Sequence, residues 1–260
     1  MLLHKQLVFA SLFGLIAAAC APLENETGDE ETVSGASIPI IGGRTDAGDP
    51  AVVAIFAHPA NSNYGSLCTG TVISSRAVLT AAHCVDPHAI GEGVEFEVYQ
   101  GTNFGSASSS LKVSSIAFDP AFDINGIQNG HDIAIVTLAQ PTELTPVPVN
   151  QRPLTTASLS TPVRIVGFGA NSHRDSGAGV KRTVTTTVNS IDSRLLQIGG
   201  SNQQSCHGDS GGPALQVIDG VETVIGVTSY GLDKSDTNVC FGGGYDTRVD
   251  AYSSFINQHL

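Results

Sequence analysis

The sequence predicts an all-β fold, either an antiparallel barrel or a sandwich. The chain of 260 residues contains 29 glycines and 12 prolines, and only 14% of its residues are charged. Short runs rich in β-branched residues recur along it between turn residues, without the 3.6-residue period of helices. This composition is typical of a β protein with many turns, and it argues against a disordered chain or a coiled coil.

The predicted strands follow one another from residue 51 onward. Each is a short apolar or β-branched run that ends at residues favoured in turns. The runs are AVVAIFA from Ala51, TVISSRAVLTAA from Thr71, VEFEVYQG from Val94, DIAIVTL from Asp132, VRIVGFG from Val163, TVTTTVNSI from Thr183 and VETVIGVTSYG from Val221.

A short helix is expected at the end of the chain. Asp250 is placed to cap it, and Ala251, Tyr252, Phe255 and Ile256 share one face. We expect that face to pack against the β domain.

The first 39 residues differ in composition from the rest. Lys5 precedes an apolar run over residues 7–19 that ends in three alanines, which predicts a secretory signal peptide over residues 1–19. The run is too short to span a bilayer as a helix. Residues 20–39 carry several acids and no base, which predicts an acidic pro-segment or linker. The folded domain is expected over residues 40–260.

Five cysteines make an odd number for an exported chain. Cys20 follows three alanines and resembles the acylated cysteine of bacterial lipoproteins, although Ala17 stands where those sequences usually have leucine. Two alternatives follow: Cys20 is lipidated, or the signal peptide is cleaved before it without lipidation. In either case we expect the protein to be secreted or located in the cell envelope. The remaining four can form two disulfides in an oxidising compartment. These are Cys68, Cys84, Cys206 and Cys240.

The charge balance argues against a nucleic-acid partner. Twelve Lys and Arg face 24 Asp and Glu, which gives a formal net charge of -12 at pH 7. A chain of this sign repels the phosphate backbone that dominates nucleic-acid affinity.

Three segments place reactive side chains among small or apolar neighbours. They are TAAHC over residues 80–84, HDIAIVTL over 131–138 and CHGDSGGP over 206–213. A serine hydroxyl is a weak nucleophile until a base removes its proton, and an imidazole serves as that base when a carboxylate orients it. Each segment alone has a structural explanation, as a core histidine, a strand start or a turn. Together they favour nucleophilic catalysis, because small residues around Ser210 leave backbone N–H groups free for an oxyanion.

These segments resemble the chymotrypsin/trypsin family of serine proteases, and the resemblance covers residues 40–260. It implies two six-stranded antiparallel β-barrels with the site between them, followed by a short helix. It also implies that Ser210 is the nucleophile, His83 the general base and Asp132 the carboxylate that orients it. The backbone N–H groups of Gly208 and Ser210 would then form the oxyanion hole.

The same resemblance assigns structural and substrate-binding roles. It pairs Cys68 with Cys84 and Cys206 with Cys240. The Thr-Ser-Tyr-Gly segment resembles the strand that pairs with an extended substrate backbone. The residues concerned are Ser229, Tyr230 and Gly231.

The residue six positions before the nucleophile largely sets the primary specificity of the family. Here it is Gln204, and Gly231 and Gly244 match the two wall positions. A neutral amide supplies no charge to offset the desolvation of lysine or arginine. We therefore expect a large uncharged residue at P1. The alternative is a trypsin-like preference for basic residues, for which Asp233 or Asp236 on the adjoining loop would have to reach the pocket.

Residues 40–43, Ile-Ile-Gly-Gly, resemble the N-terminus that zymogens of this family expose on cleavage. The freed amino group of Ile40 would pair with Asp209, because a buried carboxylate without a partner is costly. Pro39 stands where trypsin-activated precursors have a basic residue, so we expect an activating protease that is not trypsin-like.

Neither a cofactor nor a metal ion is expected. Residues 101–112, where some trypsins carry an acidic calcium loop, contain no carboxylate. The expected partners are protein or peptide substrates and an activating protease, with membrane contact only through a lipid on Cys20 and with a monomeric chain. A catalytically inactive binding homologue and a structural lipoprotein are the alternatives. The intact triad argues against the first, and the GDSGG motif argues against the second.

Overall fold

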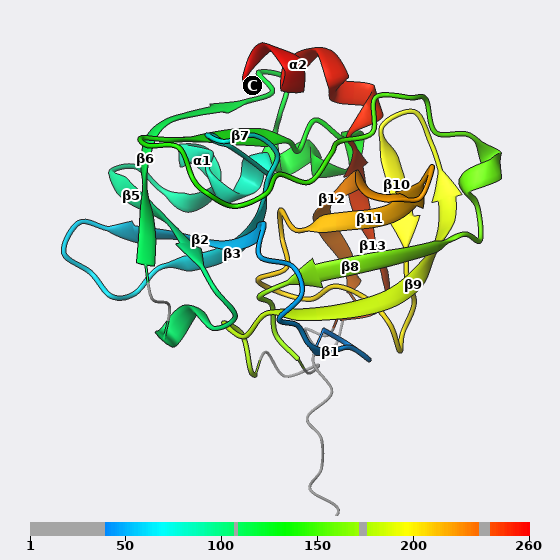
Figure 1. The fold of residues 1–260 in the computed structure, drawn as a ribbon, viewed down its shortest axis with the longest axis horizontal. Coiled ribbons are helices and arrows are strands. Elements are labelled where there is room, and N and C mark those ends of the chain that lie inside the picture. The colour runs from blue at the N-terminus through cyan, green and yellow to red at the C-terminus, as the bar shows by residue number, and fades with distance from the viewer. Residues whose placement is uncertain (1–39, 107–108, 172–175, 234–239) are drawn as a thin grey trace, which may run out of the picture. The chain divides into compact units, whose positions relative to one another are not determined.

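The computed structural model describes residues 40–260, apart from 107–108, 172–175 and 234–239 (Figure 1). The predicted signal peptide, the acidic segment and Cys20 lie outside the described residues. None of the described helices is long and apolar enough to cross a membrane.

The first half of the domain is a closed antiparallel barrel in the order β2-β3-β4-β7-β6-β5. All but the last residue of β2 are buried, because one face fills the barrel and the other lies toward β8 of the second barrel. The strands are β2 (Val52–Pro59), β3 (Ser66–Val72), β4 (Ala77–Thr80), β5 (Val94–Gln100), β6 (Ser109–Phe118) and β7 (Ala134–Leu138).

The second half is also a six-stranded antiparallel barrel, in which pairing of β8 with β9 closes the order β9-β10-β13-β12-β11-β8. The short strand β1 (Arg44–Thr45) extends it beside β9. The predicted pair of six-stranded barrels is thereby confirmed. The strands are β8 (Pro162–Gly167), β9 (Arg182–Ile191), β10 (Leu195–Ile198), β11 (Pro213–Ile218), β12 (Val221–Asp233) and β13 (Cys240–Arg248).

The predicted C-terminal helix is present, but its start differs from the prediction. A 3₁₀ turn, η5 (Asp250–Tyr252), leads into α2 (Ser253–Gln258), drawn in red in Figure 1. Asp250 does not cap the helix, because its carboxylate accepts hydrogen bonds from Leu154 N and the Arg248 guanidinium. Of the predicted apolar face, Tyr252 and Ile256 are buried, whereas Ala251 is exposed.

Several strands were missing from the sequence prediction. β6 is largely half-exposed and has many serines, and β13 contains three consecutive glycines after its first two residues. Neither segment shows the dense β-branched pattern on which the prediction depended. The run from Thr71 is split between β3 and β4 by a turn, in which Ala77 N donates to Ser74 Oγ.

Candidate active site

The pairing of β4 with β7 brings His83 and Asp132 together. Thr80, at the end of β4, pairs with Ala134, at the start of β7, and the two side chains lie just beyond these ends. His83 Nδ1 lies 2.7 Å from Asp132 Oδ2, and the backbone N–H of His83 donates to Oδ1 at 2.8 Å. Because a carboxylate only accepts hydrogen bonds, the Nδ1 contact places the proton there and leaves Nε2 free to act as a base.

Asp132 is fully buried and is held by groups from both barrels. Ser229 Oγ, on β12, donates to Oδ2 at 2.5 Å, and Thr247 Oγ1, on β13, donates to the Asp132 backbone oxygen at 2.9 Å. The hydrogen bonds from Ser229 and His83 offset the cost of burying the carboxylate, and the bond from Thr247 holds the backbone of Asp132. Ser229 was predicted to contact substrate; its hydroxyl bonds Asp132, and the residue also lines the cavity beside Ser210.

Ser210 lies in the loop that enters β11, and β3 of the first barrel holds this loop. Thr69 N donates to Ser210 O at 2.8 Å, and Thr69 Oγ1 donates to Gly208 O at 2.8 Å. Gly211 has φ +80°, and a Cβ there would lie 2.1 Å from Thr80 Oγ1, so only glycine fits. Within the described residues, no hydrogen bond joins Ser210 Oγ to His83. Such bonds are often long before substrate binds.

The two predicted oxyanion-hole donors have a geometry suited to that role. Gly208 has φ +96°, and its carbonyl is fixed by Thr69. In the described part of the chain, the backbone N–H groups of Gly208 and Ser210 donate to no protein atom. Both are therefore available to a ligand oxygen.

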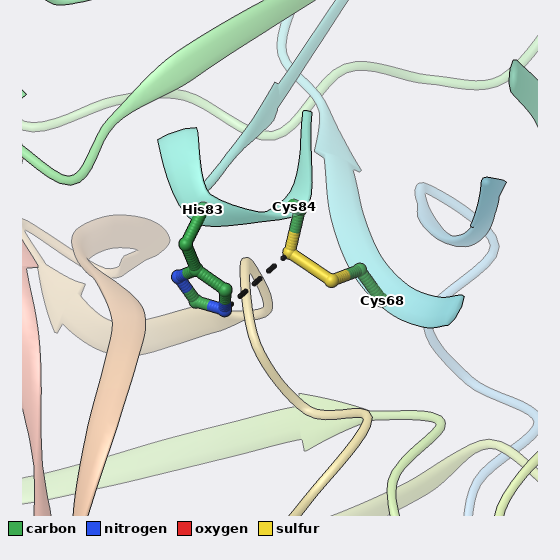
Figure 2. A group of neighbouring side chains, drawn as sticks. All are labelled: Cys68, His83 and Cys84. Atoms are coloured by element: carbon green, nitrogen blue, oxygen red, sulfur yellow. Dashed lines mark hydrogen bonds between the residues drawn. A yellow bond between two sulfur atoms is a disulfide. The ribbon is translucent and has the colours of Figure 1, made fainter. Parts of the chain in front are cut away.

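Both predicted disulfides, Cys68–Cys84 and Cys206–Cys240, are present. Figure 2 shows the first beside His83, whose Nε2 lies 3.7 Å from Cys84 Sγ. The ligand atoms of Cys68, His83 and Cys84 lie within 4.8 Å of one another, a grouping that can hold a metal ion. The sulfurs are bonded to each other, so neither is a thiolate ligand. The disulfide instead fixes the turn η1 (Ala82–Cys84) to β3.

Asp209, the predicted partner of the Ile40 amino group, is fully buried. Its Oδ1 accepts from Gly169 N at 2.8 Å and its Oδ2 from Cys206 N at 2.9 Å. Burial raises the pKa of Asp209 to about 7, although these N–H groups and the charge of Arg182 act to lower it. Ile40 is also fully buried, in the core of the second barrel.

A cavity of about 250 Å³ opens beside Ser210. The predicted substrate residues Ser229, Tyr230 and Gly231 line it. Among the described lining residues, only His207 and Tyr230 have ionisable side chains. Its lining consists of Ser205, Cys206, His207, Ser210, Thr228, Ser229, Tyr230, Gly231 and Cys240.

The two remaining residues predicted to form the pocket are Gly244 and Gln204. Gly244 is not a lining residue itself, but a Cβ at this position would lie 3.0 Å from Oγ of Ser205, which lines the cavity. Gln204 is 1% exposed and is not a lining residue; its Oε1 accepts a hydrogen bond from Gly243 N, on β13, at 2.6 Å. Asp236 and the side chain of Asp233 lie outside the described part of the chain.

A family model described as Trypsin matches residues 40–256. The chain belongs to the trypsin family. It is a chymotrypsin-like serine endopeptidase.

Curated relatives of this trypsin-family chain include both elastases and trypsins. Chymotrypsin-like elastase family member 1 of Bos taurus is 29% identical over 222 residues, which cover 78% of this chain and 82% of the relative. The protein of the same name from Canis lupus familiaris is 33% identical over a region that covers 73% of this chain and 80% of the relative. Trypsin of Phaedon cochleariae is 31% identical over a region that covers 74% of this chain and 78% of the relative.

Several residues that build this trypsin-family site were not predicted from the sequence. Thr69 positions the loop of the nucleophile, and Thr247 holds Asp132. Threonines are common in strands, and their partners here are 139 and 115 positions away along the chain. No local pattern identifies such contacts; they depend on how the two barrels pack.

Proposed function

We propose that this endopeptidase cleaves peptide bonds through an acyl-enzyme on Ser210, with His83 as general base and Asp132 as the carboxylate that orients it. The observation that carries the proposal is the 2.7 Å contact between His83 Nδ1 and Asp132 Oδ2. It fixes the imidazole tautomer whose Nε2 can accept the serine proton.

In the proposed reaction, His83 Nε2 takes the proton of Ser210 as Oγ attacks the scissile carbonyl carbon. The N–H groups of Gly208 and Ser210 stabilise the oxyanion of the tetrahedral intermediate. Protonated His83 then gives its proton to the leaving amine as the peptide C–N bond breaks. Water, activated by the same histidine, hydrolyses the ester and releases Ser210.

Replacing the nucleophile tests this role. Ser210→Ala should lower kcat by several orders of magnitude and leave the fold intact. Ser114→Ala, on the exposed face of β6, is the matched control and should keep wild-type activity. Undiminished turnover in Ser210→Ala would refute the assignment.

We also propose that cleavage before Ile40 activates the enzyme. The support is that Ile40 and Asp209 are both fully buried, and that Asp209 forms no salt bridge among the described residues. A free amino group at Ile40 would supply the missing cation. Purified active enzyme that retains residues 20–39 would contradict the proposal.

At neutral pH we propose a large uncharged P1 residue. The cavity beside Ser210 has no acidic lining residue among those described, and Gly231 leaves one wall open. The relatives named elastase and trypsin leave a basic P1 preference as the alternative. Rates on substrates that differ only in P1, measured at pH 7 with Phe, Leu, Gln, Lys and Arg, distinguish the two.

Two disulfides in an elastase-like protease support secretion. Removal of residues 1–19 as a signal peptide and lipidation at Cys20 are our proposals for the N-terminus. Mass spectrometry of the cell-derived precursor tests both, because an acyl chain on Cys20 adds a defined mass.

A further inference from the structure

A buried carboxylate without a partner lies on β13 of the second barrel. Asp246 is 1% exposed, and within the described residues its Oδ2 forms no hydrogen bond. A buried polar group without a hydrogen-bond partner lowers the stability of the fold unless a ligand or a water molecule binds it.

The strand register places Asp246 on the side of the sheet that faces the cavity beside Ser210. Thr228, on β12, pairs directly with Asp246, so the two side chains lie on the same face. Thr228 lines the cavity. Gly244 precedes Asp246 by two positions on the same strand and faces Ser205, another lining residue. Two separate relations therefore put Asp246 behind the cavity wall.

The groups that face Asp246 from the neighbouring strands are uncharged. They are Gly226 and Thr228 on β12 and Leu196 on β10. Burial raises the pKa of Asp246 to about 8, and no charged or titratable group of the described residues contributes to the shift. The Thr228 hydroxyl also has no hydrogen-bond partner among the described residues.

We propose that Asp246 is the specificity residue that receives a cationic P1 side chain, so that the enzyme accepts lysine and arginine once Asp246 is ionised. This inference rests on the proposed peptidase function. The P1 cation supplies the counter-charge that the protein does not provide. Thr228 can join the two groups, because a hydroxyl can accept from the cation and donate to the carboxylate.

The inference makes the P1 preference depend on pH. Below its pKa of about 8, Asp246 is protonated in the free enzyme, and the pocket is neutral. As the pH rises through that value the carboxylate ionises, and selection for Lys and Arg appears. A cation that binds at neutral pH must displace the proton of Asp246.

The test uses enzyme processed at Ile40 and substrates that differ only in P1. The ratio of kcat/KM for Lys to kcat/KM for Leu should rise about tenfold between pH 7 and pH 9, as the ionised fraction of a group with a pKa near 8 rises by that factor. Effects of pH that are common to both substrates cancel in the ratio. Asp246→Asn should give a low ratio that does not change with pH.

Two further variants complete this experiment. Asp219→Asn, at an exposed turn, is the matched control and should keep the rise. Thr228→Val should lower the Lys-to-Leu ratio at pH 9 several-fold, and it tests the inference if Asp246→Asn fails to fold. A flat ratio in the wild type, or an unchanged rise in Asp246→Asn, would overturn the inference. Wild-type enzyme that hydrolyses none of these substrates would instead refute the proposed function.

A binding measurement tests Asp246 independently of catalysis. Calorimetry of p-aminobenzamidine with the Ser210→Ala variant, in two buffers of different ionisation enthalpy, reports the protons released on binding. About 0.9 proton per ligand should be released at pH 7, since a group with a pKa of about 8 is mostly protonated there. The variant that also carries Asp246→Asn should release none, and equal release by both variants would contradict the inference.

Discussion

Ser229 Oγ and Asp132 Oδ2 lie 2.5 Å apart, and this carboxylate oxygen is the one that also contacts His83 Nδ1. The serine belongs to the second barrel and the aspartate to the first, so the bond joins the two barrels at the centre of the site. The orientation of the general base therefore depends on how the barrels pack.

Removing this donor should weaken both folding and catalysis. In Ser229→Ala, one bond to a buried carboxylate is lost, at a cost of about 1–3 kcal/mol, and Asp132 holds His83 less firmly. We expect kcat to fall about tenfold with a small change in KM. Steady-state kinetics of Ser229→Ala and of the control Ser114→Ala measure this effect. Equal kcat values for the two variants would show that the bond has no catalytic role.

Thr69 should act on the oxyanion hole without touching substrate. Thr69→Val removes the donor to Gly208 O and the acceptor of Phe168 N, and it leaves the backbone bond to Ser210 O in place. Because Gly208 would lose its fixed orientation, kcat should fall by about 10-fold to 100-fold while KM stays near its wild-type value. Thr69→Ser keeps the hydroxyl and should restore kcat. Failure of this rescue would indicate a packing effect.

The loop of the nucleophile should tolerate no side chain at Gly211. In Gly211→Ala, the new Cβ would meet Thr80 Oγ1 at 2.1 Å and Thr69 O at 2.3 Å, so we expect a loss of more than about 3 kcal/mol in the free energy of unfolding. Gly220 also has a positive φ, +82°, but faces open space. Gly220→Ala should therefore cost only about 1 kcal/mol. Denaturant titration of both variants checks this, and similar losses would contradict it.

Activation should change how stability depends on pH. In the folded uncleaved chain the pKa of Asp209 is about 7, so the carboxyl stays protonated at a pH where a free aspartate, with a pKa of about 4, has lost its proton. The stabilisation from this proton is complete below pH 4 and is lost as the pH rises through 7. Pairing with the Ile40 amino group lowers the pKa of Asp209 and removes this loss.

The comparison requires one protein in two states. A Ser210→Ala chain with an enteropeptidase site placed before Ile40 can be unfolded by denaturant at several pH values, before and after cleavage. Between pH 4 and pH 7 the uncleaved form should lose more stability than the cleaved form. Asp246 contributes equally to both, so the difference reports Asp209. Identical profiles would show that the amino group of Ile40 does not reach Asp209.

The paired amino group should itself titrate in the active enzyme. Ion pairing raises its pKa, so the active conformation should be fully favoured below the pKa of a free amine and lost as the pH rises through the raised value. Activity at high pH should therefore fall as the N-terminus deprotonates. Acetylation of the Ile40 amino group should abolish activity at every pH, and an acetylated enzyme with full activity would contradict the pairing.

The sequence motifs predicted the residues that the structure brings together around His83, Asp132 and Ser210, because each motif is contiguous and chemically distinctive. Contacts that depend on register were not predicted. Asp246 was overlooked because its place behind the pocket follows from the strand register, in which it pairs with Thr228, and not from any local motif. Counting back from Ser210 located Gln204 but could not show that Gly243 N–H binds its amide oxygen or that Gln204 does not line the cavity.

We propose activation of Ser210 as a nucleophile by His83 and Asp132. Its most direct test is the reaction of enzyme processed at Ile40 with a diphenyl phosphonate, followed by mass spectrometry of the digested adduct. We predict one phosphonate per chain, on the peptide containing Ser210, with no adduct in Ser210→Ala and greatly slowed labelling in His83→Ala. An unmodified Ser210, or equal labelling of His83→Ala, would contradict the claim.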